Sequence, residues 1–88
     1  MSGICRVGID SAGGVIVGVN QNGTVFTNGF LVSVDKDRVQ GHGTGTHAGP
    51  VMIAKSKNVF VNGIAVCKEG NTATCGHPAS GSTDVFVG

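Results

Sequence analysis

Three histidines and one cysteine have side chains that transition metals prefer, and they occupy glycine-rich segments of the chain. His42 and His47 lie five residues apart, and Cys75 and His77 are separated by a single glycine. Imidazole nitrogen and cysteine sulfur are good zinc ligands, and a closed structural site takes four ligands in a tetrahedron. These four residues make up such a set and use all the histidines of the chain. The sequence therefore predicts a metal site formed by His42, His47, Cys75 and His77.

Other interpretations of these residues stay open at this point. The two spacings are not those of standard zinc fingers, lone loop histidines are most often surface residues, and iron is a conceivable alternative to zinc. Cys67 lies in a β-like run, where we expect a small buried hydrophobe, and it is the reserve ligand. Cys5 fits either a buried or an exposed position. The glycines around the ligands allow the loops to bring them together, namely Gly41, Gly43, Gly45 and Gly76.

The composition favours one small domain, residues 1–88, that needs a constraint besides its core. Eighty-eight residues bury little surface, and the chain has no Trp or Tyr, four Phe and sixteen Gly. Glycine loses more conformational entropy on folding than other residues, so a metal would supply a useful staple. Three cysteines are an odd number without framework spacing, which argues against a disulfide scaffold and for free thiols.

Charge and hydropathy exclude several classes of function. Six Lys and Arg against five Asp and Glu leave a net charge of +1, and no basic cluster of the kind that binds phosphates occurs. We therefore expect no nucleic-acid binding. The apolar stretches are too short to span a bilayer, and the N-terminus lacks the charged and apolar regions of a signal peptide.

A Val-Phe segment occurs three times along the chain. The copies are 24–27, 58–61 and 84–87, and the first two run directly into Asn28-Gly29 and Asn62-Gly63. Asn-Gly favours the two-residue turn with positive φ that joins right-twisted strands, so each of these two copies predicts a β-hairpin, whereas the third ends at Val87-Gly88, where the turn would begin. Further β-like runs precede and follow the first two copies, at 14–18, 30–34, 50–54 and 64–67, with short polar connections between strands.

No helical periodicity of useful length appears, because Gly or Pro interrupts nearly every window. The predicted fold class is all-β, with short strands and glycine-rich loops. The simplest interpretation of the repeated Val-Phe is a set of core strand residues. That interpretation does not explain three copies in so small a domain, which instead suggest approximate threefold symmetry.

These features together resemble the PAAR-repeat family. The resemblance covers nearly the whole chain, from Val7 to Gly88, and its most specific parts are 58–66, 75–77 and 82–88. The opening segment 6–14 resembles the start of the family, but Ser11-Ala12 stand where many members carry a histidine. Val66-Cys67 also replace an arginine that follows the second copy's alanine. These departures indicate a diverged branch, as in contractile-tailed phages.

The resemblance implies a small conical domain with pseudo-threefold repeats that caps the blunt end of a trimeric β-helical spike, one copy per trimer. Zinc near the apex would be held by His42, His47, His77 and Cys75. The expected function is to sharpen the spike of a phage tail baseplate, in the virion, so that it pierces the target cell membrane in a transient contact, without a stable homo-oligomer. The residues expected to dock on the spike are Val25, Phe26, Val59, Phe60, Val85 and Phe86.

Two alternatives differ in role. The first is a type VI secretion spike tip or adaptor for effector delivery, with no effector attached covalently, because no extension flanks the repeats; a non-covalent cargo stays open. The second is a small zinc hydrolase, which needs an open coordination position and a general base. Four protein ligands and the lack of Asp or Glu near the histidines argue against this, so no enzymatic activity is expected.

Overall fold

The computed structural model describes residues 2–17, 25–55 and 59–87 as short strands, turns and loops. The predicted polar connections lie mostly outside these ranges, as does Gly88. The regular elements are β1 (Ser2–Gly3), β2 (Ser11–Ala12), β3 (Gly14–Val15), β4 (Phe26–Thr27), β5 (Phe30–Leu31), the 3₁₀ turn η1 (Gly45–His47), β6 (Phe60–Val61), β7 (Ile64–Ala65) and β8 (Phe86–Val87). The described part of the chain is therefore all-β apart from one 3₁₀ turn, as the sequence predicts. It includes no helix long and apolar enough to cross a membrane.

The Asn-Gly turns join the predicted hairpins. β4 pairs with β5 across Asn28-Gly29, and β6 pairs with β7 across Asn62-Gly63, both antiparallel. Asn28 has a φ of 54° and Gly29 one of 83°, and the second turn repeats these positive values at 53° and 79°. Positive φ at both central residues is the requirement that makes Asn-Gly favourable there. The prediction of the two hairpins is confirmed.

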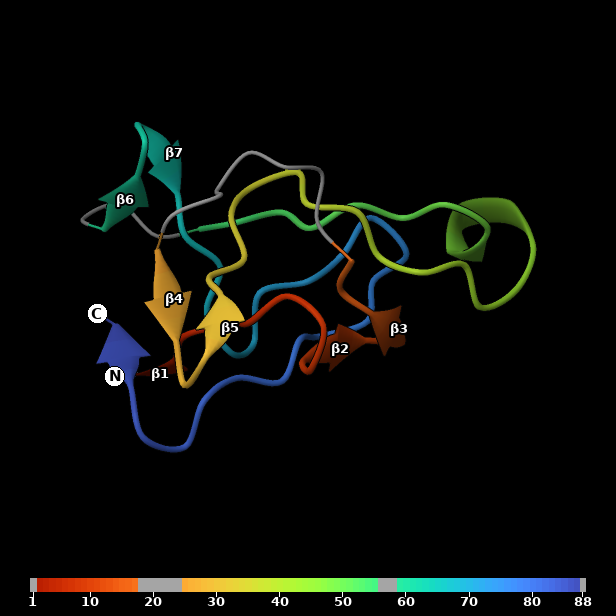
Figure 1. The fold of residues 1–88 in the computed structure, drawn as a ribbon. Helices are drawn as coiled ribbons and strands as arrows, with labels where there is room; N and C mark the ends of the chain where they lie inside the picture. The colour runs from red at the N-terminus through yellow and green to blue at the C-terminus, as the bar shows by residue number, and fades with distance from the viewer. Residues whose placement is uncertain (1, 18–24, 56–58, 88) are drawn as a thin grey trace.

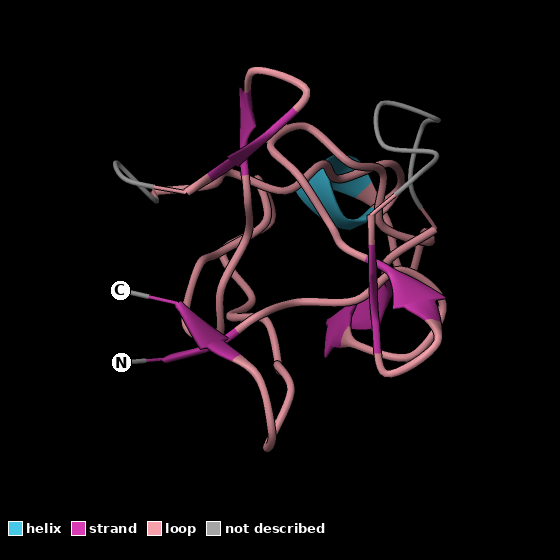
Figure 2. Ribbon diagram, turned by 60° about the vertical axis from the view of Figure 1, so that its left-hand side comes forward, coloured by secondary structure: helices cyan, strands magenta, loops and turns pink. Residues whose placement is uncertain are grey.

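The third Val-Phe copy pairs with the start of the chain. β8 is antiparallel to β1, with Ser2 opposite Val87 and Gly3 opposite Phe86. Figure 2 shows the two ends of the chain side by side at this pair. The N-terminal residues therefore take the place that β5 and β7 occupy in the other two hairpins. We call β4–β5, β6–β7 and β1–β8 the three arms.

The segments that directly follow β1, β5 and β7 make the same backbone contacts with one another. Cys5 N–H donates to the Cys67 carbonyl, Cys67 N–H to Ser33 and Ser33 N–H to Cys5, at 2.9–3.0 Å. These bonds close a ring of three segments that lie far apart in the sequence. The turn that follows the ring residue is also similar in the three segments. In each one a buried Asp or Asn side chain accepts a hydrogen bond from the backbone N–H of the residue three or four positions earlier, and these side chains are Asp10, Asp37 and Asn71.

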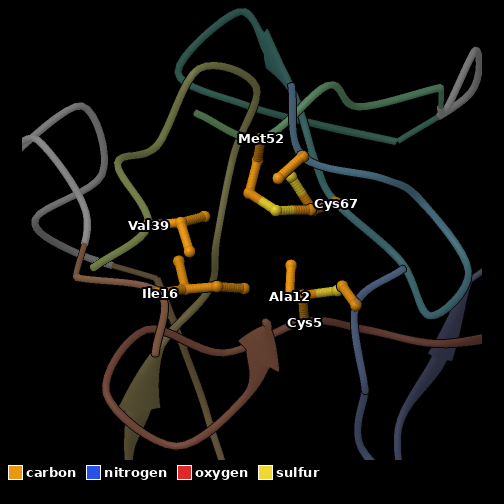
Figure 3. Close-up of a cluster of buried hydrophobic side chains, with 8 residues drawn as sticks. Cys5, Ala12, Ile16, Val39, Met52 and Cys67 are labelled. Carbon is orange, nitrogen blue, oxygen red and sulfur yellow. The ribbon is translucent and has the colours of Figure 1, made fainter. Parts of the chain in front are cut away.

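The buried apolar residues form two small clusters. One is made by residues of the arms and of the segments next to them, namely Ile4, Val32, Val34, Val61, Val66 and Val87. The other contains Cys5, Ala12, Ile16, Val39, Met52, Cys67, Ala73 and Ala79, and Figure 3 shows six of them converging from separate segments. In Figure 1 the arms lie at one end of the molecule, and η1 lies at the other. The longest of the three extents is 32 Å.

Candidate metal centre

Two loops at the end of the molecule opposite the arms carry the four predicted ligands. His42 and His47 flank a tight loop, in which His42 N–H donates to the His47 carbonyl at 2.8 Å. Cys75 lies in a turn that Gly76 N–H closes onto the carbonyl of Ala73 at 2.9 Å. Ala73 N–H in turn donates to the His77 carbonyl at 3.0 Å. Each loop thus places two ligands on the same side by local backbone hydrogen bonds.

The four side chains converge. One ligand atom of each residue lies within 4.8 Å of the other three, and all four residues are half-buried. His42 Nε2 lies 3.0 Å from His77 Nδ1, 3.1 Å from His47 Nδ1 and 3.6 Å from Cys75 Sγ, and Cys75 Sγ lies 3.5 Å from His77 Nδ1. The prediction that the fold brings these residues together is confirmed. The arrangement is compatible with a metal site.

A second contact orients the His42 ring. Its Nδ1 lies 3.0 Å from the carbonyl oxygen of Gln40. A carbonyl only accepts, so a neutral His42 ring carries its proton on Nδ1 and leaves the Nε2 lone pair free for the other three side chains. In a metal-binding histidine, the ring nitrogen that does not bind the metal commonly donates to a carbonyl or carboxylate in this way, which fixes the tautomer of the ligand. The donor set and its surroundings therefore fit a metal ion.

Two glycines of the first repeat complete the site without contributing a ligand. A Cβ on Gly13, whose φ is +88°, would overlap His77 Nδ1 and lie 2.6 Å from His42 Nε2. A Cβ on Gly14 would overlap the carbonyl oxygen of Gln40, the acceptor for His42. Neither glycine was among the residues predicted for the site. One signal could have located them. Gly13 and Gly14 directly follow Ser11-Ala12, the position at which many members of the resembling family carry a histidine.

The other two cysteines lie outside the group. Both are fully buried in the apolar cluster next to the ring, and all three cysteines of the chain are free thiols. Burial raises the pKa of Cys67 to about 12 and that of Cys5 further, so both remain protonated at neutral pH. Metals bind the thiolate rather than the thiol. Cys67 is therefore a core residue, as its β-like run predicts, and not a reserve ligand.

The Val-Phe residues lie in the arms at the opposite end. Phe26, Phe60 and Phe86 are 57%, 53% and 48% exposed, whereas the next residue of each strand is buried. Val25 and Val85 are also exposed, and only Val59 is half-buried against the apolar cluster. The interpretation of these phenylalanines as core residues is therefore wrong. In a two-residue strand one side chain faces the core and its neighbour faces away, and the buried one is Thr27, Val61 or Val87.

No protein-family model matches the chain, and no curated protein is similar to it. The resemblance to the PAAR-repeat family, with the spike partner it implies, thus stays a prediction. The described residues establish an all-β domain that brings three histidines and one cysteine into a group able to hold a metal ion.

Proposed function

We propose that the protein is a PAAR-type spike tip, which caps the blunt end of a trimeric β-helical spike in a contractile injection machine. The observation that supports this most is the division between the two ends of the molecule. One end repeats a two-stranded arm three times, each with an exposed phenylalanine, and the other gathers four possible metal ligands. A cap needs both, because it joins a threefold partner at one end and narrows to a small tip at the other.

The arms supply the means of docking. A single chain can match a trimer only if it presents three similar surfaces at similar angles. Phe26, Phe60 and Phe86 occupy the same register position in their arms, opposite Leu31, Ala65 and Gly3. The strands of the arms could extend the β-structure of the spike by strand addition, while the exposed rings cover its apolar end.

Zinc is the ion that suits the site best. Zinc–ligand bond lengths in a regular tetrahedron separate two nitrogens by about 3.3 Å and a nitrogen from a sulfur by about 3.6 Å. The nitrogen pairs around His42 are 3.0 and 3.1 Å apart, and the two nitrogen–sulfur distances are 3.5 and 3.6 Å. Three nitrogens and one thiolate fill a structural zinc site completely. The ion would cross-link η1, which has no buried residue, to the turn that carries Cys75 and His77, and so stiffen the tip.

The metal part of the proposal is tested by replacing His42 with Ala and Cys75 with Ser in one variant. The variant should contain no zinc by mass spectrometry under native conditions, and its thermal unfolding temperature should fall sharply. A variant with Cys67 replaced by Ser is the control for zinc content, which should stay normal, because its thiol lies outside the ligand group. A normal zinc content in the double variant would refute the ligand assignment.

The docking part is tested by mixing the protein with the trimeric β-helical fragment of its cognate spike. Light scattering should give one copy per trimer, and replacing Phe26, Phe60 and Phe86 together by Ser should abolish binding. Replacing Ile53 by Ser is the control, because Ile53 is similarly exposed, at 40%, but belongs to none of the arms. A stoichiometry of three copies per trimer would overturn the proposed docking. Whether the spike belongs to a phage baseplate or to a type VI apparatus follows from which trimer binds.

A further inference from the structure

The four candidate ligands are not equivalent in their contacts. His42 Nε2, His77 Nδ1 and Cys75 Sγ form a triangle with sides of 3.0, 3.5 and 3.6 Å. The backbone of the first repeat covers this triangle, because Gly13 packs against the two nitrogens and the Ala12 carbonyl oxygen lies 3.9 Å from Cys75 Sγ. Neither of these contacts involves the fourth ligand, His47.

The segments that carry the triangle are tied to neighbouring segments of the fold. Next to Cys75, Thr74 N–H donates to the Val51 carbonyl at 2.8 Å, and Ala73 forms a β-bridge with Met52. The chain before His42 is held in the same way, because Gln40 N–H donates to the Val15 carbonyl at 2.8 Å. Ala73 and Met52 belong to the buried apolar cluster. Displacing any of these three ligands would therefore disturb contacts between repeats.

His47 has no comparable support. It ends η1, none of whose residues is buried. Among the hydrogen bonds between described residues, those of the η1 loop, residues 43–48, stay within residues 42–48. The backbone bonds are His47 N–H to Thr44 at 3.2 Å, Ala48 N–H to Gly45 at 3.1 Å and His42 N–H to His47 at 2.8 Å, and the side-chain contact is His47 Nδ1 to His42 Nε2 at 3.1 Å. The η1 loop can therefore move outward while the contacts between repeats remain in place.

We propose that the metal enters and leaves by withdrawal of His47 on the η1 loop. This inference rests on the proposed metal site. His42, Cys75 and His77, backed by Ala12 and Gly13, form a three-ligand half-site that stays assembled, and His47 is the removable fourth ligand. With His47 withdrawn, the fourth position is open to water or to an external nitrogen donor of the imidazole class. The exchange replaces one neutral ligand by another and needs no redox step.

The first test compares two glycines that both have positive φ and both have open space around an added Cβ. Gly45, at +62°, lies in the η1 loop, and Gly76, at +90°, lies between Cys75 and His77. Replacing Gly45 by Ala strains the closed loop, so zinc release to excess chelator should become faster by about fivefold or more, from the usual left-handed penalty. Replacing Gly76 by Ala should leave the release rate within about twofold, because that segment stays in place. Equal acceleration by both variants, or acceleration by Gly76→Ala alone, would overturn the proposal.

The second test removes the ligands themselves and uses Co(II), whose visible absorption reports its coordination. His47→Gly should still bind one Co(II), and its spectrum should change on addition of imidazole toward that of the wild type. His77→Gly is the control and should lose at least tenfold more affinity than His47→Gly, because it breaks the half-site. Equal losses, or a greater loss in His47→Gly, would contradict the inference. A wild-type protein that takes up neither zinc nor Co(II) would instead refute the proposed metal site.

Discussion

Replacing Gly13 by Ala should weaken zinc binding at the proposed site although no candidate ligand is changed. The added Cβ would lie 2.6 Å from His42 Nε2 and closer still to His77 Nδ1. Both distances are well inside van der Waals contact, and the rings can yield only by moving on the order of 1 Å, about half a metal–nitrogen bond length. Two of the four ligands would therefore leave the positions that a tetrahedral ion requires.

Gly13→Ala should lower both the stability of the fold and the affinity for the metal, and the two losses can be measured separately. The left-handed φ of +88° makes Ala unfavourable by about 1–2 kcal/mol in the free energy of unfolding. The displacement of two ligands adds a loss of metal affinity. Changes beside a metal ligand commonly lower affinity by about 10–100-fold, and we expect at least the upper end, about 2.8 kcal/mol, because two ligands move.

Gly29→Ala is the matched control for this experiment. Gly29 has nearly the same φ, +83°, but lies in the turn of the β4–β5 arm with nothing within 4 Å of an added Cβ. Both variants should lose similar stability when unfolded in the presence of a chelator. In a competition titration with a chromogenic chelator, only Gly13→Ala should lose zinc affinity. Equal zinc affinities of the two variants would refute the argument that the first repeat closes the metal site.

Three further changes test the contacts that hold the fold. Lys36, three residues after Ser33, has a φ of 69°, and the residues three after Cys5 and Cys67 are glycines with positive φ, Gly8 and Gly70. Lys36→Gly should therefore raise the free energy of unfolding by about 0.5–1 kcal/mol in urea titrations, and an unchanged value would contradict strain there. The buried Ser33 hydroxyl has no hydrogen-bond partner in the described chain except the weakly bonding Cys67 thiol beside it. Ser33→Cys should therefore stabilise by about 1 kcal/mol and Cys67→Ser should destabilise. Although burial raises the pKa of Asp10, hydrogen bonds from Arg6 and Ser80 lower it more, to below its usual value. The stability that this carboxylate contributes is thus present above about pH 4 and lost below it. Asp10→Asn should be less stable than the wild type at pH 7, and a stability difference that does not shrink as the pH falls below about 4 would contradict the assignment.

The sequence predicted the local structure well because local chemistry decides it. Asn28-Gly29 and Asn62-Gly63 form the expected turns, since few residues other than Asn and Gly accept positive φ at both central positions. The four candidate ligands were found for a similar reason. Histidine and cysteine are scarce in this chain, and few other side chains supply nitrogen or sulfur to a metal.

Other features depend on contacts between distant segments, which a pattern of residue types does not specify. Pairing of β8 with β1 makes the N-terminus the missing strand of the third arm, although Ser2-Gly3 has no strand propensity. The exposure of the phenylalanines was decided by which face of each two-residue strand meets the apolar cluster, and both faces carry apolar residues in 59–61 and 85–87.

The residues themselves thus determined the all-β class, the two hairpin turns and the identity of the four candidate ligands. Only the tertiary structure decided that Gly13 and Gly14 belong to the candidate metal centre. A metal ligand can be recognised from its side chain in the sequence, whereas a glycine contributes to such a site through the space that its missing side chain leaves free. That space has meaning only once the closed ring of Cys5, Ser33 and Cys67 has brought the three repeats together.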